Sequence, residues 1–127
     1  MNTQGKHILV LDDEMSIRES LSDFLEDFDF QVKSAETAEA ALEILKSNNI
    51  QVAIVDMRLP GIDGNSFIVQ AHEMWPDMKF IIHTGSVNYH MTQDVRKVGV
   101  KEEYVFLKPI GNLMTFVDAI NDLLGQT

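Results

Sequence analysis

Carboxylates follow two of the apolar runs in this sequence. Asp12 and Asp13 come directly after His7–Leu11, and Asp56 comes directly after Val52–Val55. Carboxylate oxygens suit Mg²⁺, which keeps several of its waters and also binds phosphate groups. Two carboxylates about 5 Å apart repel each other by about 3 kcal/mol at an effective dielectric constant near 20, so a fold that gathers three of them needs a cation or a proton to relieve the repulsion. These residues therefore predict a Mg²⁺ site, provided that the two runs end on the same side of the molecule.

A hydroxyl group and an ammonium group stand at the ends of two further apolar runs. Thr84 comes shortly after Lys79–Ile82, and Lys108 comes directly after Tyr104–Leu107. Donors of this kind stabilise the oxygens of a phosphoryl group during transfer. A carboxylate can itself be the nucleophile and form an aspartyl phosphate. We identify Asp56 as the candidate nucleophile because it stands alone, whereas the two adjacent aspartates are better placed to hold metal.

The segments that must position these side chains are of two alternating kinds. Short continuous apolar runs predict strands that are covered on both faces. Segments with one apolar stripe at helical spacing predict amphipathic helices. The predicted strands are His7–Leu11, Gln31–Ala35, Val52–Val55, Lys79–Ile82 and Tyr104–Leu107, and the predicted helices are Ile17–Phe28, Thr37–Lys46, Gly64–Met74, Val87–Val98 and Leu113–Leu124.

The alternation of strand and helix predicts an α/β fold. A parallel sheet with right-handed crossovers carries helices on both faces. Among doubly wound sheets we expect the five-stranded flavodoxin-like order 2-1-3-4-5, in which ligands bind beyond the carboxyl ends of the strands. All the polar residues named above would then meet at one rim. The chain has no internal repeat and no linker-like stretch, so we expect residues 1–127 to form a single domain.

The composition excludes several classes of function. The formal net charge is -10, which would repel a nucleic-acid backbone, so we expect no direct nucleic-acid binding. There is no cysteine, which excludes disulfides and thiolate metal sites. No apolar run approaches the roughly 20 residues of a membrane span, and the short polar N-terminus is unlike a signal peptide. We therefore expect a cytoplasmic protein without membrane association.

Four motifs in this order resemble those of the response-regulator receiver family over essentially the whole chain. They are Leu11-Asp12-Asp13-Glu14, the stretch from Asp56 to Gly64, Thr84-Gly85 and Lys108-Pro109. The resemblance implies a phosphorylatable receiver domain of bacterial two-component signalling. Each motif is weak alone, but the order and spacing of all four are highly specific.

The resemblance also implies a role for each acidic residue. Asp56 would accept the phosphoryl group from the phosphohistidine of a sensor histidine kinase or a histidine phosphotransfer protein. Asp13 and Asp56 would bind Mg²⁺ directly together with the backbone carbonyl of Arg58, and Asp12 would bind it through water. Such a regulator would catalyse only its own phosphorylation and dephosphorylation.

Further implications concern the switch. Thr84 and Lys108 would contact the phosphoryl oxygens, and the Lys108–Pro109 bond would be cis. The phosphorylated domain would act on a downstream protein or on an output domain outside this chain, and a dimer that forms on phosphorylation would also fit the family.

Two departures from the family pattern bear on the switch. Gly99–Lys108 is about two residues longer than usual, and Val105 stands three residues before Lys108, where family members usually carry a switching Tyr or Phe. We therefore expect phosphorylation to act mainly through Thr84 and a backbone shift in Thr84–Tyr89. Tyr104 could replace the missing aromatic residue only if its strand carried a bulge.

Two other functions fit parts of the pattern. A small phosphatase or hydrolase with an aspartate nucleophile usually has a second Asp two residues later, where this chain has Arg58. A flavodoxin-like electron carrier needs a Ser-, Thr- and Gly-rich loop after the first strand to hold phosphate, and the acidic Asp12-Asp13-Glu14 would repel it.

Overall fold

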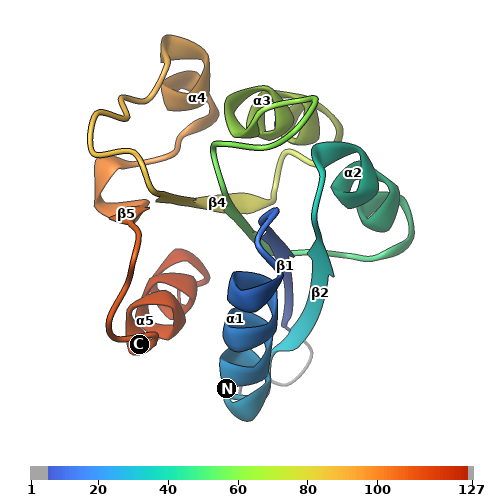
Figure 1. The fold of residues 1–127 in the computed structure, drawn as a ribbon. Coiled ribbons are helices and arrows are strands. Elements are labelled where there is room, and N and C mark those ends of the chain that lie inside the picture. Colours follow the sequence, from blue (N-terminus) through green and yellow to red (C-terminus); the bar gives the residue numbers. More distant parts are fainter. Residues whose placement is uncertain (1–5, 126–127) are drawn as a thin grey trace.

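Five parallel strands form a single sheet between two layers of helices in the computed structural model, which describes residues 6–125 (Figure 1). The strand order is β2-β1-β3-β4-β5. The predicted α/β class and the flavodoxin-like order 2-1-3-4-5 are therefore confirmed. The strands are β1 (His7–Leu11), β2 (Gln31–Ala35), β3 (Val52–Val55), β4 (Lys79–Thr84) and β5 (Val105–Leu107).

The helices divide between the two faces of the sheet. Figure 1 shows α2, α3 and α4 on one face and α1 and α5 on the other. Each helix layer packs against the sheet and forms a separate hydrophobic core. One core contains Phe67 of α3, and the other contains Phe116 of α5. The helices are α1 (Met15–Asp27), α2 (Ala38–Ser47), α3 (Gly64–Met74), α4 (Gln93–Val98) and α5 (Met114–Leu123).

The three central strands are buried on both faces, as their continuous apolar runs predict. All four residues of β3 are buried, and β1 and β4 are buried except at their first residue. The edge strand β2 is largely exposed. Because the strands are parallel, their carboxyl ends lie together at one rim of the sheet. The residues that follow the buried strands therefore meet at this rim.

The fourth predicted helix is wrong at its N-terminal end. We expected Val87–Val98, but α4 begins only at Gln93. Its N-cap is Thr92, whose side chain accepts a hydrogen bond from the amide of Val95 and so satisfies a free helix-end donor. The loop before α4 begins with a turn in which the Thr84 hydroxyl accepts a hydrogen bond from the amide of Ser86. Local side-chain hydrogen bonds therefore outweigh the helical spacing of the apolar residues.

The segment around Tyr104 also differs from the prediction. Tyr104 ends a short 3₁₀ helix (Glu102–Tyr104), and β5 starts one residue later. The ring of Tyr104 is buried in the core under α5, and its hydroxyl donates to the carboxylate of Asp122. The pairing of β5 with β4 is regular, with Ile82 opposite Val105, so there is no bulge. Tyr104 therefore lies on the face opposite α4, whereas Val105 packs toward the α3–α4 core.

Within residues 6–125, no helix is both long and apolar enough to cross a membrane.

Candidate functional site

The fold brings the predicted acidic residues together at the carboxyl ends of β1 and β3. The two strands pair in register, with Leu11 opposite Val55, so the residues that follow them are neighbours. Asp12 and Asp56 are buried, with only 1% and 3% of their surfaces exposed, whereas Asp13 is exposed. The cluster thus has a buried floor and an open side.

The donor atoms fit a hard divalent cation. Carboxylate oxygens of Asp12, Asp13 and Asp56 all lie within 4.8 Å of one another. An all-oxygen set with an open side suits Mg²⁺, which retains waters and binds few protein ligands. The amide of Arg58 donates to Asp56 Oδ1 at 3.3 Å, so Arg58 follows the acceptor closely in the loop after β3.

Lys108 neutralises part of this negative charge. Its Nζ lies 2.9 Å from Asp12 Oδ2, 3.0 Å from Glu14 Oε2 and 3.5 Å from Asp56 Oδ2. The peptide bond between Lys108 and Pro109 is cis, as expected. A lysine so placed is already within reach of any group attached to Asp56.

Burial and mutual repulsion disturb the titration of these groups. Burial, reinforced by the charge of Asp12, raises the pKa of Asp56 to about 6. Burial also raises the pKa of Asp12, although the amide of Glu14 and the ammonium of Lys108 oppose the rise. For Lys108, burial acts to lower the pKa, but hydrogen bonds to Asp12 and Glu14 outweigh it and the pKa is raised. A strongly perturbed carboxyl group in an acidic cluster marks Asp56 as the functional residue of the site.

Two further contacts shape the rim. Thr84 is buried at the end of β4, and its carbonyl accepts from the amide of Lys108 at 2.7 Å, which joins the ends of β4 and β5. At the start of α3, a Cβ on Gly64 would lie 2.4 Å from the carbonyl oxygen of Asp56. Only glycine permits that close approach, so α3 begins directly against the acceptor loop.

Three side-chain contacts at or near the site were not predicted from the sequence. Glu14 is an ion-pair partner of Lys108. Arg18 of α1 donates from Nη1 to the carbonyl of Asp12 at 2.9 Å and so holds the acidic loop. Tyr89, in the loop before α4, donates to Asn65 of α3 at 2.9 Å. No spacing signal marks these contacts, because each joins separate elements through long side chains.

His83 lies beside the site without taking part in its hydrogen bonds. It is 5% exposed, and neither ring nitrogen has a hydrogen-bond partner within the described part of the chain. Its ring stands edge-to-face against Phe116, with centroids 4.9 Å apart. Burial, followed by the charge of Lys108, lowers the pKa of His83 to about 4, so the imidazole is neutral at pH 7. His83 therefore packs in the core as a neutral side chain.

Comparison with protein families identifies a family that matches most of this chain. The model of the response regulator receiver domain matches residues 8–121. Among curated proteins, the hydrogenase transcriptional regulatory protein HoxA of Cupriavidus necator is 30% identical over 86% of this chain and 22% of its own length. The transcriptional regulatory protein FixJ of Bradyrhizobium diazoefficiens is 29% identical over 78% of this chain and 48% of its own length. The chain thus spans about a fifth to a half of these relatives.

Solved structures share the whole fold. A CheY-like response regulator receiver domain protein from Methanospirillum hungatei has a TM-score of 0.85 and 28% identity, over 94% of both chains. The response regulator protein TrrA from Thermotoga maritima, solved in complex with Mg²⁺-BeF, has a TM-score of 0.80 and 30% identity, over 93% of this chain and 98% of that one.

Proposed function

The chain belongs to the response regulator receiver domain family, and on that premise we propose that it is a signalling switch phosphorylated on Asp56. The observation that carries the proposal is the cluster of Asp12, Asp13 and Asp56 with Lys108 at its edge. The proposal treats residues 1–127 as one receiver domain of a cytoplasmic two-component system.

In the proposed reaction, a carboxylate oxygen of Asp56 attacks the phosphorus of a phosphohistidine. A P–O bond forms, and the P–N bond breaks with its electron pair passing to the imidazole. The position of the Asp56 carboxylate suits this role. Its Oδ1 accepts a hydrogen bond from the backbone amide of Arg58, and its Oδ2 faces the ammonium group of Lys108. The reaction requires the ionised carboxylate, and a pKa of about 6 leaves most of Asp56 ionised at pH 7.

The same residues supply the proposed Mg²⁺ site. Asp13 and Asp56 would hold the ion directly with the Arg58 carbonyl, and Asp12 would hold it through water. When bound, Mg²⁺ supplies charge neutralisation for the phosphoryl oxygens. The exposed side of the cluster at Asp13 leaves room for the waters that Mg²⁺ retains.

We propose that Thr84 and Lys108 transmit the phosphorylated state. Lys108 now contacts Asp12 and Glu14, and a phosphoryl group on Asp56 would compete for its ammonium. Because the backbones of Thr84 and Lys108 are hydrogen bonded to each other, a shift at either one moves the ends of β4 and β5 together. The proposed output is a change in the face formed by α4, β5 and α5, read by a downstream protein, by an output domain or by a second copy in a phosphorylation-dependent dimer.

The phosphodonor is proposed to be a sensor histidine kinase or a histidine phosphotransfer protein. Since Asp56 is buried, the donor must approach over the rim. A cavity of about 580 Å³ opens there between α1 and the segment after β5, with Ile17, Ile110 and Leu113 in its lining together with Lys108. An apolar surface directly beside the acceptor supports docking of a protein donor.

Transfer from a small phosphodonor tests the acceptor. Acetyl phosphate with Mg²⁺ should add one phosphoryl group to the wild-type protein, as seen by intact-mass measurement, and none to Asp56→Asn. Asp23→Asn, an exposed carboxylate on α1, is the matched control and should be modified like the wild type. An unchanged adduct on Asp56→Asn would place the acceptor elsewhere.

A further inference from the structure

A side-chain hydrogen bond joins the loop that follows β4 to the helix that follows the acceptor. The hydroxyl of Tyr89 donates to Oδ1 of Asn65, the second residue of α3, at 2.9 Å, although the two residues lie 24 positions apart in the chain. Burial, followed by the charge of Glu102, raises the pKa of Tyr89 to about 12. The hydroxyl is therefore protonated at pH 7 and acts as the donor of this bond.

The α3 end of the hydrogen bond is fixed relative to the acceptor. The helix begins directly against the loop after β3, since a Cβ on Gly64 would lie 2.4 Å from the carbonyl oxygen of Asp56. Phe67 and Ile68, in the first turns of α3, are fully buried in the core. Because close packing holds both sides of this contact, Asn65 has little freedom to move relative to Asp56.

The other end of the hydrogen bond is connected to Thr84. The amide of Tyr89 donates to the carbonyl of Ser86 at 3.2 Å, which closes a turn. The amide of Ser86 in turn donates to the hydroxyl oxygen of Thr84 at 3.2 Å. Val87 and Asn88, at the corner of the turn, are exposed. No core packing holds that corner in place, so the turn can move together with the Thr84 side chain.

The proposed phosphorylation would act on this connected segment from one side. A phosphoryl group on Asp56 that takes a hydrogen bond from Thr84 draws the Thr84 hydroxyl toward itself, and the turn bonded to that hydroxyl follows. The bond from Tyr89 to Asn65 opposes the movement, because it ties the far end of the same turn to the fixed start of α3.

We propose that the hydrogen bond between Tyr89 and Asn65 holds the loop after β4 in its unphosphorylated position and breaks when Asp56 is phosphorylated. Tyr89 is thus a positioning residue, which sets how readily the domain adopts its phosphorylated conformation. The inference rests on the proposed function, because it requires a phosphoryl group at Asp56.

The affinity for beryllofluoride, a mimic of the phosphoryl group, measures this preference in the presence of Mg²⁺. Tyr89→Phe and Asn65→Ala should each bind beryllofluoride about fivefold more tightly than the wild type, the equivalent of about 1 kcal/mol for one hydrogen bond. The double variant should bind no more tightly than either single variant, because each substitution removes the same bond. A hydrogen bond that only supported the fold would lower the free energy of unfolding when removed, without tightening this binding.

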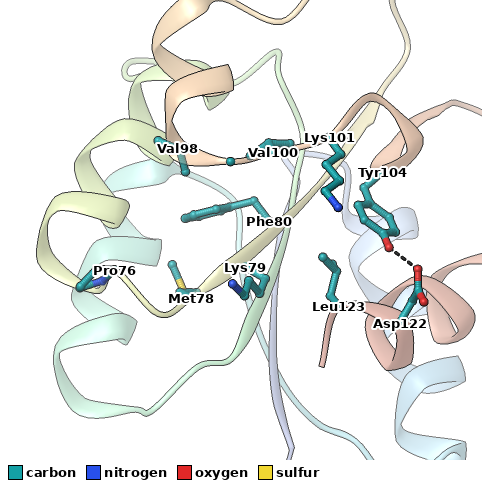
Figure 2. A pocket seen from close by; sticks show the side chains of 11 residues that line it. Pro76, Met78, Lys79, Phe80, Val98, Val100, Lys101, Tyr104, Asp122 and Leu123 are labelled. Carbon is teal, nitrogen blue, oxygen red and sulfur yellow. Dashed lines mark hydrogen bonds between the residues drawn. The ribbon is translucent and has the colours of Figure 1, made fainter. Parts of the chain in front are cut away.

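The second tyrosine of the chain provides a matched control. The hydroxyl of Tyr104 donates to the carboxylate of Asp122, within the core on the α1 and α5 side of the sheet (Figure 2). Tyr104→Phe should therefore leave the affinity for beryllofluoride unchanged. In the wild-type protein with ¹³C-labelled tyrosine rings, beryllofluoride should shift the NMR signals of the Tyr89 ring and leave those of Tyr104 in place.

Failure of this inference can be told apart from failure of the proposed function. If the wild type binds beryllofluoride but Tyr89→Phe and Asn65→Ala bind it equally or more weakly, the hydrogen bond does not oppose the switch, and only the inference is overturned. If the wild type binds beryllofluoride no more tightly than Asp56→Asn does, the proposed function fails and the inference fails with it.

Discussion

His83 and Asp56 should make opposite contributions to the dependence of stability on pH. The pKa of His83 is lowered from 6.5 to about 4 by burial. Below pH 6.5 the unfolded chain therefore binds a proton that the folded protein refuses, and stability is lost as the pH falls toward 4. Between pH 7 and pH 5 the loss amounts to about 2 kcal/mol.

Asp56 acts in the other direction. Its pKa is raised from 3.8 to about 6, first by burial and then by the charge of Asp12. As the pH falls through 6 the folded protein takes up this proton before the unfolded chain does, so folding is favoured down to about pH 3.8. Between pH 7 and pH 5 the gain is about 1.3 kcal/mol. In the wild-type protein the two contributions nearly cancel.

Single variants separate the two contributions. We expect His83→Leu to gain stability relative to the wild type on going from pH 7 to pH 5, and Asp56→Asn to lose it. The difference between the two variants in this pH-dependent change should be about 3 kcal/mol.

Urea unfolding of each protein at pH 7 and pH 5, in buffer with EDTA, measures these changes. Metal must be absent because it would hold Asp56 ionised. His83→Phe is a second variant that keeps a ring against Phe116 while removing the titration. If both His83 variants and Asp56→Asn show the same change between pH 7 and pH 5 as the wild type, the two groups do not titrate as their burial implies.

Other predictions concern the metal, the lysine and the switch. Mg²⁺ at 100 times its dissociation constant should stabilise the wild-type protein by about 2.7 kcal/mol. Asp13→Asn should lose much of that gain, and without metal it should be more stable than the wild type. A wild-type melting temperature that does not change with millimolar Mg²⁺ would show that the cluster binds no Mg²⁺. Lys108→Arg keeps the charge but changes its shape, so it should still be phosphorylated yet bind a partner poorly; wild-type partner binding after phosphorylation would contradict this. Addition of beryllofluoride should produce large NMR shifts in Thr84–Tyr89 and little reorientation at Val105; the reverse pattern would place the switch in β5.

Most of the fold could be predicted because its signals are local and mutually consistent. All of β3, and β1 after His7, are apolar, and burial on both faces is the environment that such runs require. The start of β5 and the start of α4 could not be predicted in the same way. In the structure, Tyr104 enters a 3₁₀ turn and Thr92 caps α4, and both depend on hydrogen bonds that spacing does not reveal.

The candidate site was predictable for a different reason. Topology alone places the ends of parallel strands at one rim, so Asp12, Asp56 and Lys108 could be grouped before any distance was known. The sequence could not show that Lys108 bridges Asp12 and Glu14, since that contact depends on side-chain conformations at the rim. The same holds for Tyr89 and Asn65, whose hydrogen bond links the loop before α4 to α3.

The most direct test of the central claim is chemical mapping of the phosphorylated residue. The protein is phosphorylated with acetyl phosphate and Mg²⁺ and then treated with borohydride, which reduces an aspartyl phosphate to homoserine. Peptide mass analysis should find homoserine at position 56 and at no other aspartate. Homoserine at Asp12 or Asp13, or a stable phosphoryl group on His72 or His90, would contradict the assignment of Asp56 as the acceptor.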